Sequence, residues 1–301
     1  MEKTRFITNP RSGMNRKRDI HRLIRQHFPS TGVEWEVVRT EYAGHAVRLA
    51  KEAVEQGYRM VVACGGDGSV NEIASQLIGT STILGVLPCG SGNGFAAYLG
   101  LGRDIRRALR ILTEGEVVRL DTVRMNGRPF VNLAGIGFDA QVARRLHRSR
   151  LRGFWGYLLS SLREAWRLNP LSLQIDMDGE IVRQDCLLVE VANAPVYGYG
   201  FSIVPQADAR DGRLDILVAR QASVWRYLWE ARRFIDDSFH QSPLVTCFQA
   251  EQVCVTPNRP TAIHLDGEGY KLNRSARFQL ISDSLSVMAA PGKLSTAGPG
   301  S

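Results

Sequence analysis

The sequence predicts a two-part fold in which a doubly wound α/β lobe is followed by an antiparallel β-sandwich. Two observations carry this prediction. In the first third of the 301-residue chain, apolar strand-like runs alternate with segments of helical spacing, which is typical of a parallel sheet with helices on both faces. After about residue 117, the apolar segments become short and are separated by turn residues, a pattern that favours an antiparallel sandwich or barrel.

The elements of the α/β lobe follow one another in a regular order. The chain begins with a strand at 5–8, which ends in the turn Asn-Pro-Arg-Ser-Gly at 9–13. The next predicted elements are a helix at 16–28, a strand at 35–40, a helix at 43–56, a strand at 60–64, a helix at 69–78, a strand at 83–87 and a helix at 103–114. Two of the strands, 60–64 and 83–87, are continuous apolar runs, as expected of strands buried on both faces.

The second half consists of strands joined by tight turns. Strands are predicted at 117–125, 128–133, 171–177, 186–193, 214–218, 245–250, 252–256, 261–265, 277–281 and 286–290. Dipeptides such as Asn126-Gly127 and Asp178-Gly179 are typical turn residues. Helices are predicted at 139–168 and 223–238. The chain therefore divides into an α/β lobe at 1–122, a sandwich at 123–292 and a tail at 293–301 that is rich in Gly and Ser and is expected to be disordered.

The composition is that of an ordinary globular protein. Hydrophobic residues make up 44% and charged residues 23%, which excludes collagen-like, disordered and disulfide-stapled chains. The five cysteines form no C-x-x-C pair, so we expect reduced thiols rather than disulfides or structural zinc. There is no apolar leader segment, and no apolar run approaches the roughly 20 residues that span a bilayer. We therefore expect a cytoplasmic protein that is at most peripheral to a membrane.

The charge favours anionic partners. The chain carries 38 Lys and Arg against 30 Asp and Glu, for a net charge of +8. Such a balance attracts phosphates, anionic membrane surfaces or nucleic acid. No zinc-finger spacing or RNP-like pattern is present, so we expect no nucleic-acid partner.

Two Gly-rich turns each follow a buried strand directly. One is Gly65-Gly66-Asp67-Gly68-Ser69, and the other is Gly90-Ser91-Gly92-Asn93. Glycines let backbone N–H groups approach phosphate oxygens, and a following helix adds a favourable dipole. Because the carboxyl ends of parallel strands share one edge of the sheet, both turns are predicted to face one ligand. Either turn alone would be interpreted as a tight connector. The chain has neither a Walker A loop nor a G-x-G-x-x-G turn, so a bound nucleotide would depend on Mg²⁺ and backbone amides.

An ordered set of motifs resembles the catalytic domain of the diacylglycerol kinases and sphingosine kinases. The motifs are Asn9 to Gly13, Thr40 with Gly44-His45-Ala46, Gly65 to Ser69 with Asn71-Glu72, Pro88 to Asn93 with Phe95-Ala96, Asn132 with Gly135 to Asp139, Asp211 to Asp215, and Leu265 to Glu268. Each motif alone is weak, but the set runs from about residue 5 to about residue 290 in the expected order. Gly94 departs from the pattern, since many bacterial relatives carry Asp there. Ser91 keeps the hydroxyl of the Thr that many relatives carry.

The resemblance implies a bilobed lipid kinase. Its N-terminal lobe would be Rossmann-like, similar to those of NAD kinases and phosphofructokinases, and ATP would lie in the cleft between the two lobes. By motif position, the resemblance implies ATP contacts from Asn9, Pro10, Arg11, Ser12, Gly13, Thr40, Gly65, Gly66, Asp67, Gly68, Ser69, Val70, Asn71 and Ser91. The implied cofactors are ATP and Mg²⁺.

The acidic residues are candidates for catalysis. A lipid hydroxyl needs a proton acceptor before it attacks phosphorus, and a positioned carboxylate can be that acceptor. We assign Glu268 as the general base and Asp67, in a phosphate loop, as the organiser of Mg²⁺ and phosphate. The reverse assignment, with Asp67 as base, stays open, and Asp266 would support either. From the residues alone, Asp266-Gly267-Glu268 is simply a hairpin turn.

The resemblance also implies sites for a second metal ion and for the lipid. A structural Mg²⁺ would be held by the Asp211 carboxylate and by the backbone carbonyls of Asp208 and Arg213, although Asp211-Gly212 alone is interpreted as a turn. Asp139 falls where some relatives contact the lipid head group, and it can equally cap a helix that begins there.

Two segments combine basic and aromatic residues, at 144–159 and 225–234. Such segments suit an anionic membrane interface, where a lipid substrate would be met. The alternative is that their apolar faces pack on the sandwich while the arginines are solvated. The sequence leaves a homodimer open.

The predicted function is ATP- and Mg²⁺-dependent phosphoryl transfer to a lipid hydroxyl. Diacylglycerol is the default acceptor, and a sphingoid base or ceramide is an alternative. Two other interpretations stay open: an NAD kinase, which shares Gly-Gly-Asp-Gly, and a regulator that keeps the fold without turnover. The second Gly-rich turn and the Asp-Gly-Glu motif favour the lipid kinase, and the retained Asp67, Asn71, Asp266 and Glu268 argue against loss of turnover.

Overall fold

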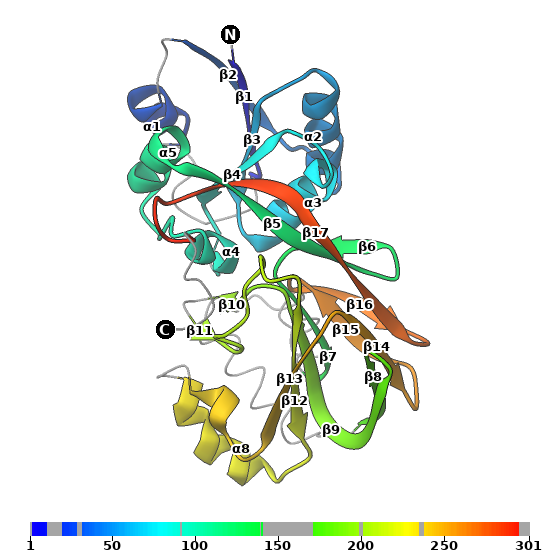
Figure 1. The fold of residues 1–301 in the computed structure, drawn as a ribbon. Coiled ribbons are helices and arrows are strands. Elements are labelled where there is room, and N and C mark those ends of the chain that lie inside the picture. Colours follow the sequence, from blue (N-terminus) through cyan, green and yellow to red (C-terminus); the bar gives the residue numbers. More distant parts are fainter. Residues whose placement is uncertain are drawn as a thin grey trace. The chain divides into compact units, whose positions relative to one another are not determined.

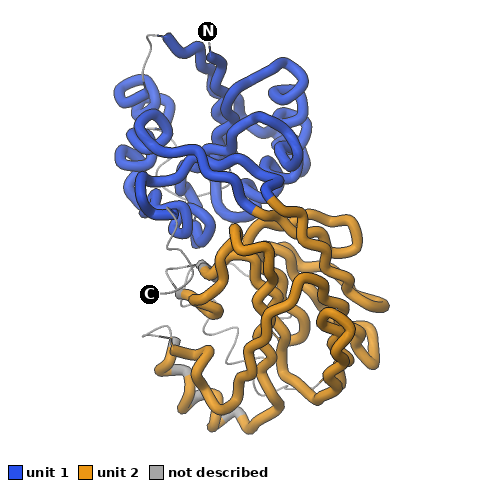
Figure 2. Tube along the Cα trace, viewed as in Figure 1, with its two compact units in different colours: residues 1–120, 283–301 blue, residues 121–282 orange. Residues whose placement is uncertain are grey.

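The computed structural model describes residues 2–10, 20–28, 32–90, 92–138, 140, 171–198, 201–234 and 238–294. The chain divides into two compact units (Figure 2). Unit 1 comprises Met1–Leu120 and Asp283–Ser301, and unit 2 comprises Asp121–Ser282. Apart from Ala140, the helix predicted at 139–168 lies outside the described residues, as does the tail from 295 onward.

Unit 1 contains the expected parallel sheet with helices on both faces (Figure 1). Its strands lie in the order β2-β1-β3-β4, with bounds Glu2–Thr8 for β1, Val33–Arg39 for β2, Met60–Gly65 for β3 and Ile83–Pro88 for β4. The helices are α1 (Ile20–His27), α2 (His45–Glu55), α3 (Asp67–Leu77), α4 (Gly94–Tyr98) and α5 (Ile105–Glu114). Helices α2 and α3 pack together on one face, and α1 and α5 pack together on the other. The doubly wound α/β lobe is confirmed.

Burial explains why these residues form this sheet. Every residue of β3 and β4 is buried, so the continuous apolar runs seen in the sequence are strands covered on both faces. Helix α5 buries one apolar stripe and turns its arginines outward. The side chain of Asp104 caps it by accepting the N–H of Arg106 at 2.9 Å.

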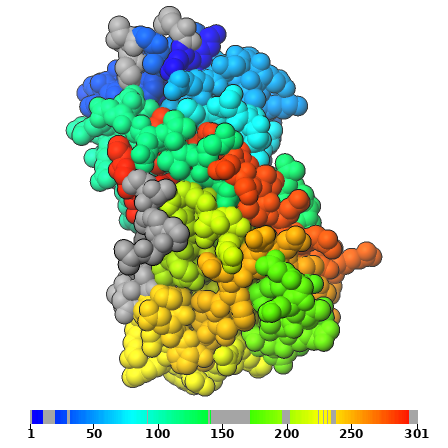
Figure 3. Space-filling view, viewed as in Figure 1, coloured from blue at the N-terminus to red at the C-terminus, as the bar shows by residue number. Residues whose placement is uncertain are grey.

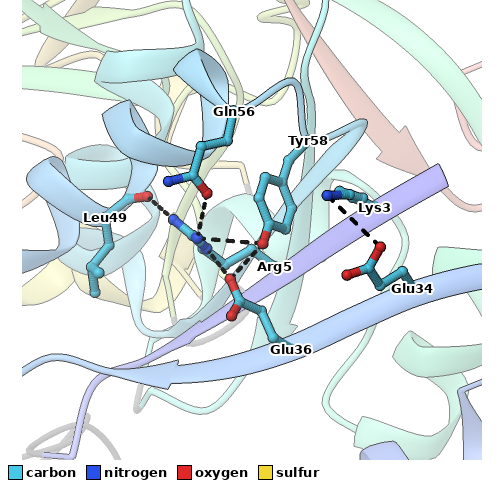
Figure 4. A network of polar contacts seen from close by, with 7 residues as sticks. All are labelled: Lys3, Arg5, Glu34, Glu36, Leu49, Gln56 and Tyr58. Carbon is cyan, nitrogen blue, oxygen red and sulfur yellow. Dashed lines mark hydrogen bonds and ion pairs between the residues drawn. The ribbon is translucent and has the colours of Figure 1, made fainter. Parts of the chain in front are cut away.

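A polar network ties β1 to its neighbours (Figure 4). The buried guanidinium of Arg5 donates to Glu36 Oε1 on β2 at 2.5 Å and to the carbonyl of Leu49 in α2 at 3.1 Å. It also lies over the ring of Tyr58, 4.5 Å from the centroid, and the Tyr58 hydroxyl donates to Glu36 at 2.7 Å. A strand, a neighbouring strand and a helix are therefore joined through one buried cation.

Unit 2 is an antiparallel β-sandwich, as predicted. The strands that lie wholly or partly in this unit are β5 (Glu116–Met125), β6 (Arg128–Phe130), β7 (Leu133–Gly137), β8 (Leu171–Met177), β9 (Glu180–Ala192), β12 (Leu214–Arg220), β13 (Val245–Ala250), β14 (Gln252–Pro257), β15 (Thr261–Leu265), β16 (Glu268–Leu272) and β17 (Ala276–Ala289). The first half of β5 and the second half of β17 belong to unit 1. The first half of β9 pairs with β8, and its second half pairs with β7 and β12. This long strand therefore joins two layers, β6-β5-β17-β14-β8 and β13-β12-β9-β7-β15-β16. The main apolar cluster of the unit draws residues from both layers.

Smaller elements complete unit 2. They are the two-stranded sheet of β10 (Val196–Gly198) and β11 (Phe201–Ser202), the helix α8 (Val224–Glu230), and the 3₁₀ helices η1 (Ala231–Phe234) and η2 (Phe239–Gln241). The helix predicted at 223–238 is thus an α-helix that continues as a 3₁₀ turn. Among the described helices, none is long and apolar enough to cross a bilayer.

Three tight hairpins have the turn geometry that their sequences favour. Asn126, Asp178 and Asp266 have φ of 48°, 52° and 47°, and the glycine after each has a φ between 85° and 92°. Positive φ at both central residues is the type I′ turn, which matches the twist of the flanking strands. The third of these hairpins carries the Asp-Gly-Glu motif.

The structure corrects three sequence-based predictions. The strand predicted at 128–133 is two strands, because the chain turns a corner at Val131 and Asn132. The strands predicted at 277–281 and 286–290 are the single strand β17. The far half of β17 belongs to unit 1, where Val287 pairs with Leu84 of β4. Residues 283–292 were expected in the sandwich, and they return to the α/β unit because their buried side chains complete its sheet.

Candidate functional site

Strands β1 and β3 are parallel neighbours in unit 1, so their carboxyl ends lie side by side. The strand order β2-β1-β3-β4 changes direction at this pair of strands. Such a switch point is where open α/β sheets bind ligands. Asn9 follows β1, and its side-chain amide donates to Ser69 Oγ at 3.2 Å. Its backbone N–H donates to the carbonyl of Cys64 at 3.3 Å. Two residues expected to contact ATP are therefore brought together at the switch point.

The two Gly-rich turns touch each other. An ideal Cβ on Gly90 would lie 2.4 Å from the Cα of Gly66, closer than real Cβ atoms approach backbone. The N–H groups of Cys89 and Gly90 donate to the carbonyl of Gly65 at 3.0 and 3.1 Å. The turns therefore form one joined platform, and glycine at position 90 is a steric requirement of that contact.

Asn93 locks the second turn, and the predicted site residues did not include it. Its φ of 55° is left-handed, a conformation that asparagine tolerates better than most residues. Its Oδ1 accepts the N–H of Gly90 and its Nδ2 donates to the carbonyl of Gly90, both at 2.9 Å. An asparagine at the end of a Gly-rich turn was the signal in the sequence.

The N-terminus of α3 is open. Its cap residue, Gly66, has no side chain to accept the first N–H groups of the helix, and those groups have no partner within the helix itself. An ideal Cβ on Gly68 would meet no atom within 4 Å. Nearby on the same helix, Asn71 Oδ1 is buried with no hydrogen-bond partner among the described residues. Open amides at a helix N-terminus bind anions, phosphates above all.

Asp67 joins the first turn to α4. Its Oδ1 accepts the N–H of Phe95 in the first turn of α4 at 3.2 Å. Burial raises the pKa of Asp67, and hydrogen bonds from the backbone of Phe95, Gly94, Asp67 itself and Asn93 partly offset that rise. In the described structure the carboxylate therefore acts as a cap for α4. Its role toward Mg²⁺ or as a base stays a prediction.

Of the remaining predicted nucleotide residues, Val70 is buried within α3, and the others follow strands or lie outside the described structure. The N–H of Thr40, which follows β2, donates to the carbonyl of Thr8 at 2.9 Å, so Thr40 lies beside the end of β1. Pro10 follows Asn9 in a turn. Four of the predicted nucleotide residues lie outside the described residues: Arg11, Ser12, Gly13 and Ser91. Asp139, predicted to contact the lipid, also lies outside them.

Unit 2 carries the acidic hairpin between β15 and β16. The Asp266 carboxylate accepts the N–H groups of Val131, Asn132 and Leu133 at 2.9, 3.0 and 3.0 Å. Its side chain therefore holds the corner between β6 and β7, which is an organising role. The sequence prediction that Asp266 supports the neighbouring acid is compatible with this geometry.

Glu268 is half-buried and keeps one oxygen available. Its Oε2 accepts the hydroxyl of Tyr270 at 2.7 Å, and its Oε1 has no partner among the described residues. Arg128 lies over the ring of Tyr270, 4.8 Å from the centroid. Burial raises the pKa of Tyr270 to about 12, and the hydrogen bond to Glu268 adds to the rise. Tyr270 thus stays a hydrogen-bond donor and orients the carboxylate. Tyr270 was not among the predicted site residues; it lies two residues after Glu268, on the same face of β16.

The residues predicted to hold a structural metal ion lie in the loop at 208–213. Asp211 Oδ1 accepts the N–H of Arg213 at 2.9 Å, while Arg210 binds the Asp208 carboxylate at 2.5 and 2.8 Å. Burial raises the pKa of Asp211, and the charges of Asp208 and Asp121 add to the rise. A cation beside Asp211 would relieve this repulsion. Among the described side chains, no group of three or more His, Cys, Asp or Glu is arranged to hold a metal. The predicted site is of a different kind, because it uses one carboxylate and two backbone carbonyls.

Two family models match the chain in consecutive segments. The diacylglycerol kinase catalytic domain matches residues 3–125, and the YegS C-terminal NAD kinase beta sandwich-like domain matches residues 132–289. The order of the two matches is the order of the two architectures in the structure.

Named relatives agree with the family models. The diacylglycerol kinase of Bacillus subtilis is 28% identical over 274 residues, which cover 89% of this chain and 90% of that protein. The diacylglycerol kinase of Mycobacterium tuberculosis is 34% identical over 230 residues, which cover 73% of this chain and 74% of that protein. A solved diacylglycerol kinase structure from Bacillus anthracis superposes with a TM-score of 0.75 at 19% identity, covering 97% of this chain and 98% of that one. This last likeness shows a shared fold. The chain belongs to the diacylglycerol kinase family and is a lipid kinase.

Proposed function

We propose that this lipid kinase is ATP- and Mg²⁺-dependent and transfers the γ-phosphoryl group to a lipid hydroxyl, with diacylglycerol as the first acceptor to test. A sphingoid base or ceramide is the related alternative. The observation that carries the proposal is the open N-terminus of α3 at the switch point. The cap residue Gly66 offers these amides no side chain, and Gly66 packs against Gly90 of the second turn. The same helix carries Asn71, whose buried Oδ1 has no hydrogen-bond partner among the described residues.

The residues of unit 1 fit a nucleotide. The amides of Gly68 and Ser69 would bind phosphate oxygens, and Asn9 would hold the Ser69 hydroxyl in place. Asn71 would present its buried amide oxygen to Mg²⁺ or to a water molecule of the Mg²⁺ hydration shell. Mg²⁺ prefers hard oxygen ligands, and the Asp67 carboxylate is one. When bound, Mg²⁺ would neutralise the charge that develops on the transferred phosphoryl group.

Glu268 is our choice for the general base. Its Oε1, which has no partner among the described residues, can accept the proton of a lipid hydroxyl as the hydroxyl oxygen attacks phosphorus. Tyr270 occupies the other oxygen and fixes the orientation of the carboxylate. Asp67 is the rival, but its Oδ1 already accepts the N–H of Phe95 and its hydrogen bonds serve to cap a helix. The occupied carboxylate suits an organising role better than a proton-accepting one.

We also propose a structural Mg²⁺ at the Asp211 carboxylate and the carbonyls of Asp208 and Arg213. Thermal unfolding with Mg²⁺ and with a chelator would test it. The wild-type midpoint should fall in the chelator, and Asp211→Asn should unfold at the same temperature in both. Equal midpoints for the wild type in both buffers would exclude the site.

We propose that the enzyme binds its lipid acceptor at an anionic membrane surface. On α8, Trp225 and Trp229 are 70% and 65% exposed and lie four residues apart, so they share one helix face. The guanidinium of Arg232 lies over the Trp229 ring, 4.5 Å from its centroid. Figure 3 draws this part of the chain in yellow, at the surface. Exposed tryptophans beside arginines suit the interface of an anionic bilayer. The segment at 144–159, which we also propose for this contact, lies outside the described residues.

Vesicle sedimentation tests that surface. Replacing both tryptophans by alanine should weaken binding to phosphatidylglycerol vesicles by about tenfold or more. Replacing Ile181 by alanine, an exposed apolar residue elsewhere in unit 2, should leave binding unchanged. Equal binding by the double variant would exclude α8 as the docking surface.

A lipid-panel assay with labelled ATP and Mg²⁺ tests the proposed activity. The purified protein would meet mixed micelles of diacylglycerol, sphingosine, ceramide and monoacylglycerol, with NAD in a parallel tube. Label in one lipid would support the proposal and identify the acceptor. Label only in NAD would overturn it, and ATP binding without label in any tube would favour the regulator.

A further inference from the structure

A buried ionisable pair lies in the β13-β12-β9-β7-β15-β16 layer of unit 2, apart from the residues assigned above. The residue Glu190 on β9 is 0% exposed and His264 on β15 is 1% exposed. Both stand within apolar strand sequences, Leu-Val-Glu-Val and Ile-His-Leu. Burying a carboxylate is costly unless specific partners compensate, so this pair demands a structural account.

Strand register brings the pair together. His264 of β15 pairs with Gly135 of β7, and Gly135 pairs with Glu190 of β9. The three residues therefore form one row across three neighbouring strands, and side chains in such a row project from the same face of the sheet. His264 Nε2 lies 4.0 Å from Glu190 Oε2.

Gly135 has no side chain, and the space this leaves is where His264 and Glu190 approach each other. An ideal Cβ at this position would lie 2.4 Å from His264 Nε2 and 2.7 Å from Glu190 Oε1. Any side chain in the middle of the row would therefore separate the imidazole from the carboxylate. The glycine is what lets side chains two strands apart reach each other.

The pair is linked to the acidic hairpin through the other ring nitrogen. His264 Nδ1 accepts the N–H of Gly267 at 3.3 Å. Nδ1 must then carry a lone pair, which places the ring proton on Nε2, the nitrogen that faces Glu190. Gly267 is the residue directly before Glu268. One continuous set of contacts therefore runs from Glu190 through His264 to the amide that precedes the proposed base.

We propose that Glu190 and His264 are positioning residues for Glu268. Glu190 selects the Nε2–H form of His264, and Nδ1 of that form fixes the Gly267 amide at the start of β16. Asp266 holds the opposite side of the same hairpin through the corner at Val131 to Leu133. Hydrogen bonds thus hold the hairpin at both Asp266 and Gly267, and together they fix the direction of the Glu268 carboxylate. This inference rests on the proposed function only in taking Glu268 as the base.

Two amide variants separate the two ring nitrogens. The Oδ1 of asparagine falls close to the position of His Nδ1, and the Nε2 of glutamine falls close to that of His Nε2. Removing the ring alone would leave the buried Glu190 carboxylate without the neighbouring imidazole, which can prevent folding. Both variants are therefore made with Glu190→Gln, which keeps the shape and removes the charge. The comparison is between His264→Asn/Glu190→Gln and His264→Gln/Glu190→Gln.

The expected result is a split in kcat. The asparagine variant keeps the acceptor for Gly267 and should have a kcat within about threefold of Glu190→Gln alone. The glutamine variant should lose about tenfold or more, because small misplacements of a reacting group are costly. KM for ATP should be the same in both, since the nucleotide residues of unit 1 are untouched. Equal kcat values, or losses that simply follow the unfolding temperatures, would overturn the proposal.

A second measurement does not depend on activity. Nitrogen-15 NMR of histidine-labelled protein should show one ring held as the Nε2–H tautomer, and its signals should vanish in the His264→Asn/Glu190→Gln variant. An Nδ1–H ring at His264 would overturn the proposal. If no lipid is phosphorylated while this tautomer is present, the fault lies with the proposed function and not with the buried pair.

Discussion

Gly90 is the residue on which the contact between the two Gly-rich turns depends. In Gly90→Ala the new Cβ would meet the Cα of Gly66 at 2.4 Å, and only a backbone shift can relieve that clash. We expect a loss of about 1–3 kcal/mol in stability together with weaker ATP binding. Gly68→Ala is the matched control for stability, because its Cβ would enter open space. Thermal unfolding and ATP titration check this, and an unchanged Gly90→Ala protein would contradict it.

Asp67 combines two roles that substitution can separate. Asparagine can still accept the N–H of Phe95, so Asp67→Asn should unfold within about 0.5 kcal/mol of the wild type. Without the charge, it should need more Mg²⁺ for half-maximal activity. Asp67→Ala also loses the cap and should be less stable by about 1 kcal/mol. Activity measured at a series of Mg²⁺ concentrations gives the half-maximal requirement of each variant. An unchanged Mg²⁺ requirement in Asp67→Asn would remove its proposed role.

Single residues were predictable where a pattern reported backbone geometry. The glycines and Asn71 stood out because buried strands lead directly into Gly-rich turns. Asn93 and Tyr270 were missed because each acts through one partner that the pattern does not reveal. Glu190 and His264 were missed because their meeting depends on the register of three strands. A charged residue inside the apolar run Leu-Leu-Val-Glu-Val-Ala was the available signal.

At the scale of elements, the Arg5 network should make the packing of β1, β2 and α2 depend on pH. Burial tends to raise the pKa of Glu36, but hydrogen bonds from Tyr58 and Arg5 outweigh it, so the pKa lies below its usual value. A depressed folded-state pKa stabilises the fold at pH values above the unfolded pKa. That contribution is lost as the pH falls through the folded value.

Glu36→Gln tests this element. At pH 7 we expect a loss of about 1 kcal/mol, a value already reduced because the Glu36 side chain is 43% exposed. The difference between variant and wild type should shrink as the pH falls below about 4.5. Urea unfolding at a series of pH values measures it. A difference that stays constant down to pH 3 would show that the charge of Glu36 does not act as described.

Elements with a strong period were found, and elements with interruptions were not. Helices α2 and α5 and strands β3 and β4 repeat apolar residues regularly. Strand β17 was divided in two because Ser282, Asp283 and Ser284 interrupt its apolar pattern. Asp283 has a φ of 48°, so the irregularity lies within one strand. Helix α4, with five residues, is too short to show a period.

At the scale of the whole molecule, the second half of the C-terminal strand β17 belongs to the N-terminal unit. In β17, Leu285, Val287 and Ala289 are fully buried, and Val287 pairs with Leu84. Truncation after Ser282 should therefore leave unit 1 without a cooperative unfolding transition, while unit 2 keeps its own. Calorimetry of the truncated chain beside the full chain measures this. A normal transition for unit 1 in the truncated protein would contradict the division described here.

The class of the fold was accessible from the sequence because helix and strand periods differ and change near residue 117. The return of the chain was not, because a boundary drawn along the sequence cannot show that residues 283–290 complete a sheet begun by residues 2–8. The two acids proposed for catalysis could be assigned different roles only through the family resemblance. The structure adds their partners, Phe95 for Asp67 and Tyr270 for Glu268.

The central claim is that Glu268 accepts the proton of the lipid hydroxyl. The most direct measurement is kcat of Glu268→Gln, with Glu180→Gln, an exposed carboxylate on the same unit, as the matched control. We expect kcat to fall by about 10²–10⁴-fold while ATP affinity and unfolding temperature stay those of the wild type. The control should turn over normally. Full turnover by Glu268→Gln would contradict the account and would make Asp67 the base to test next.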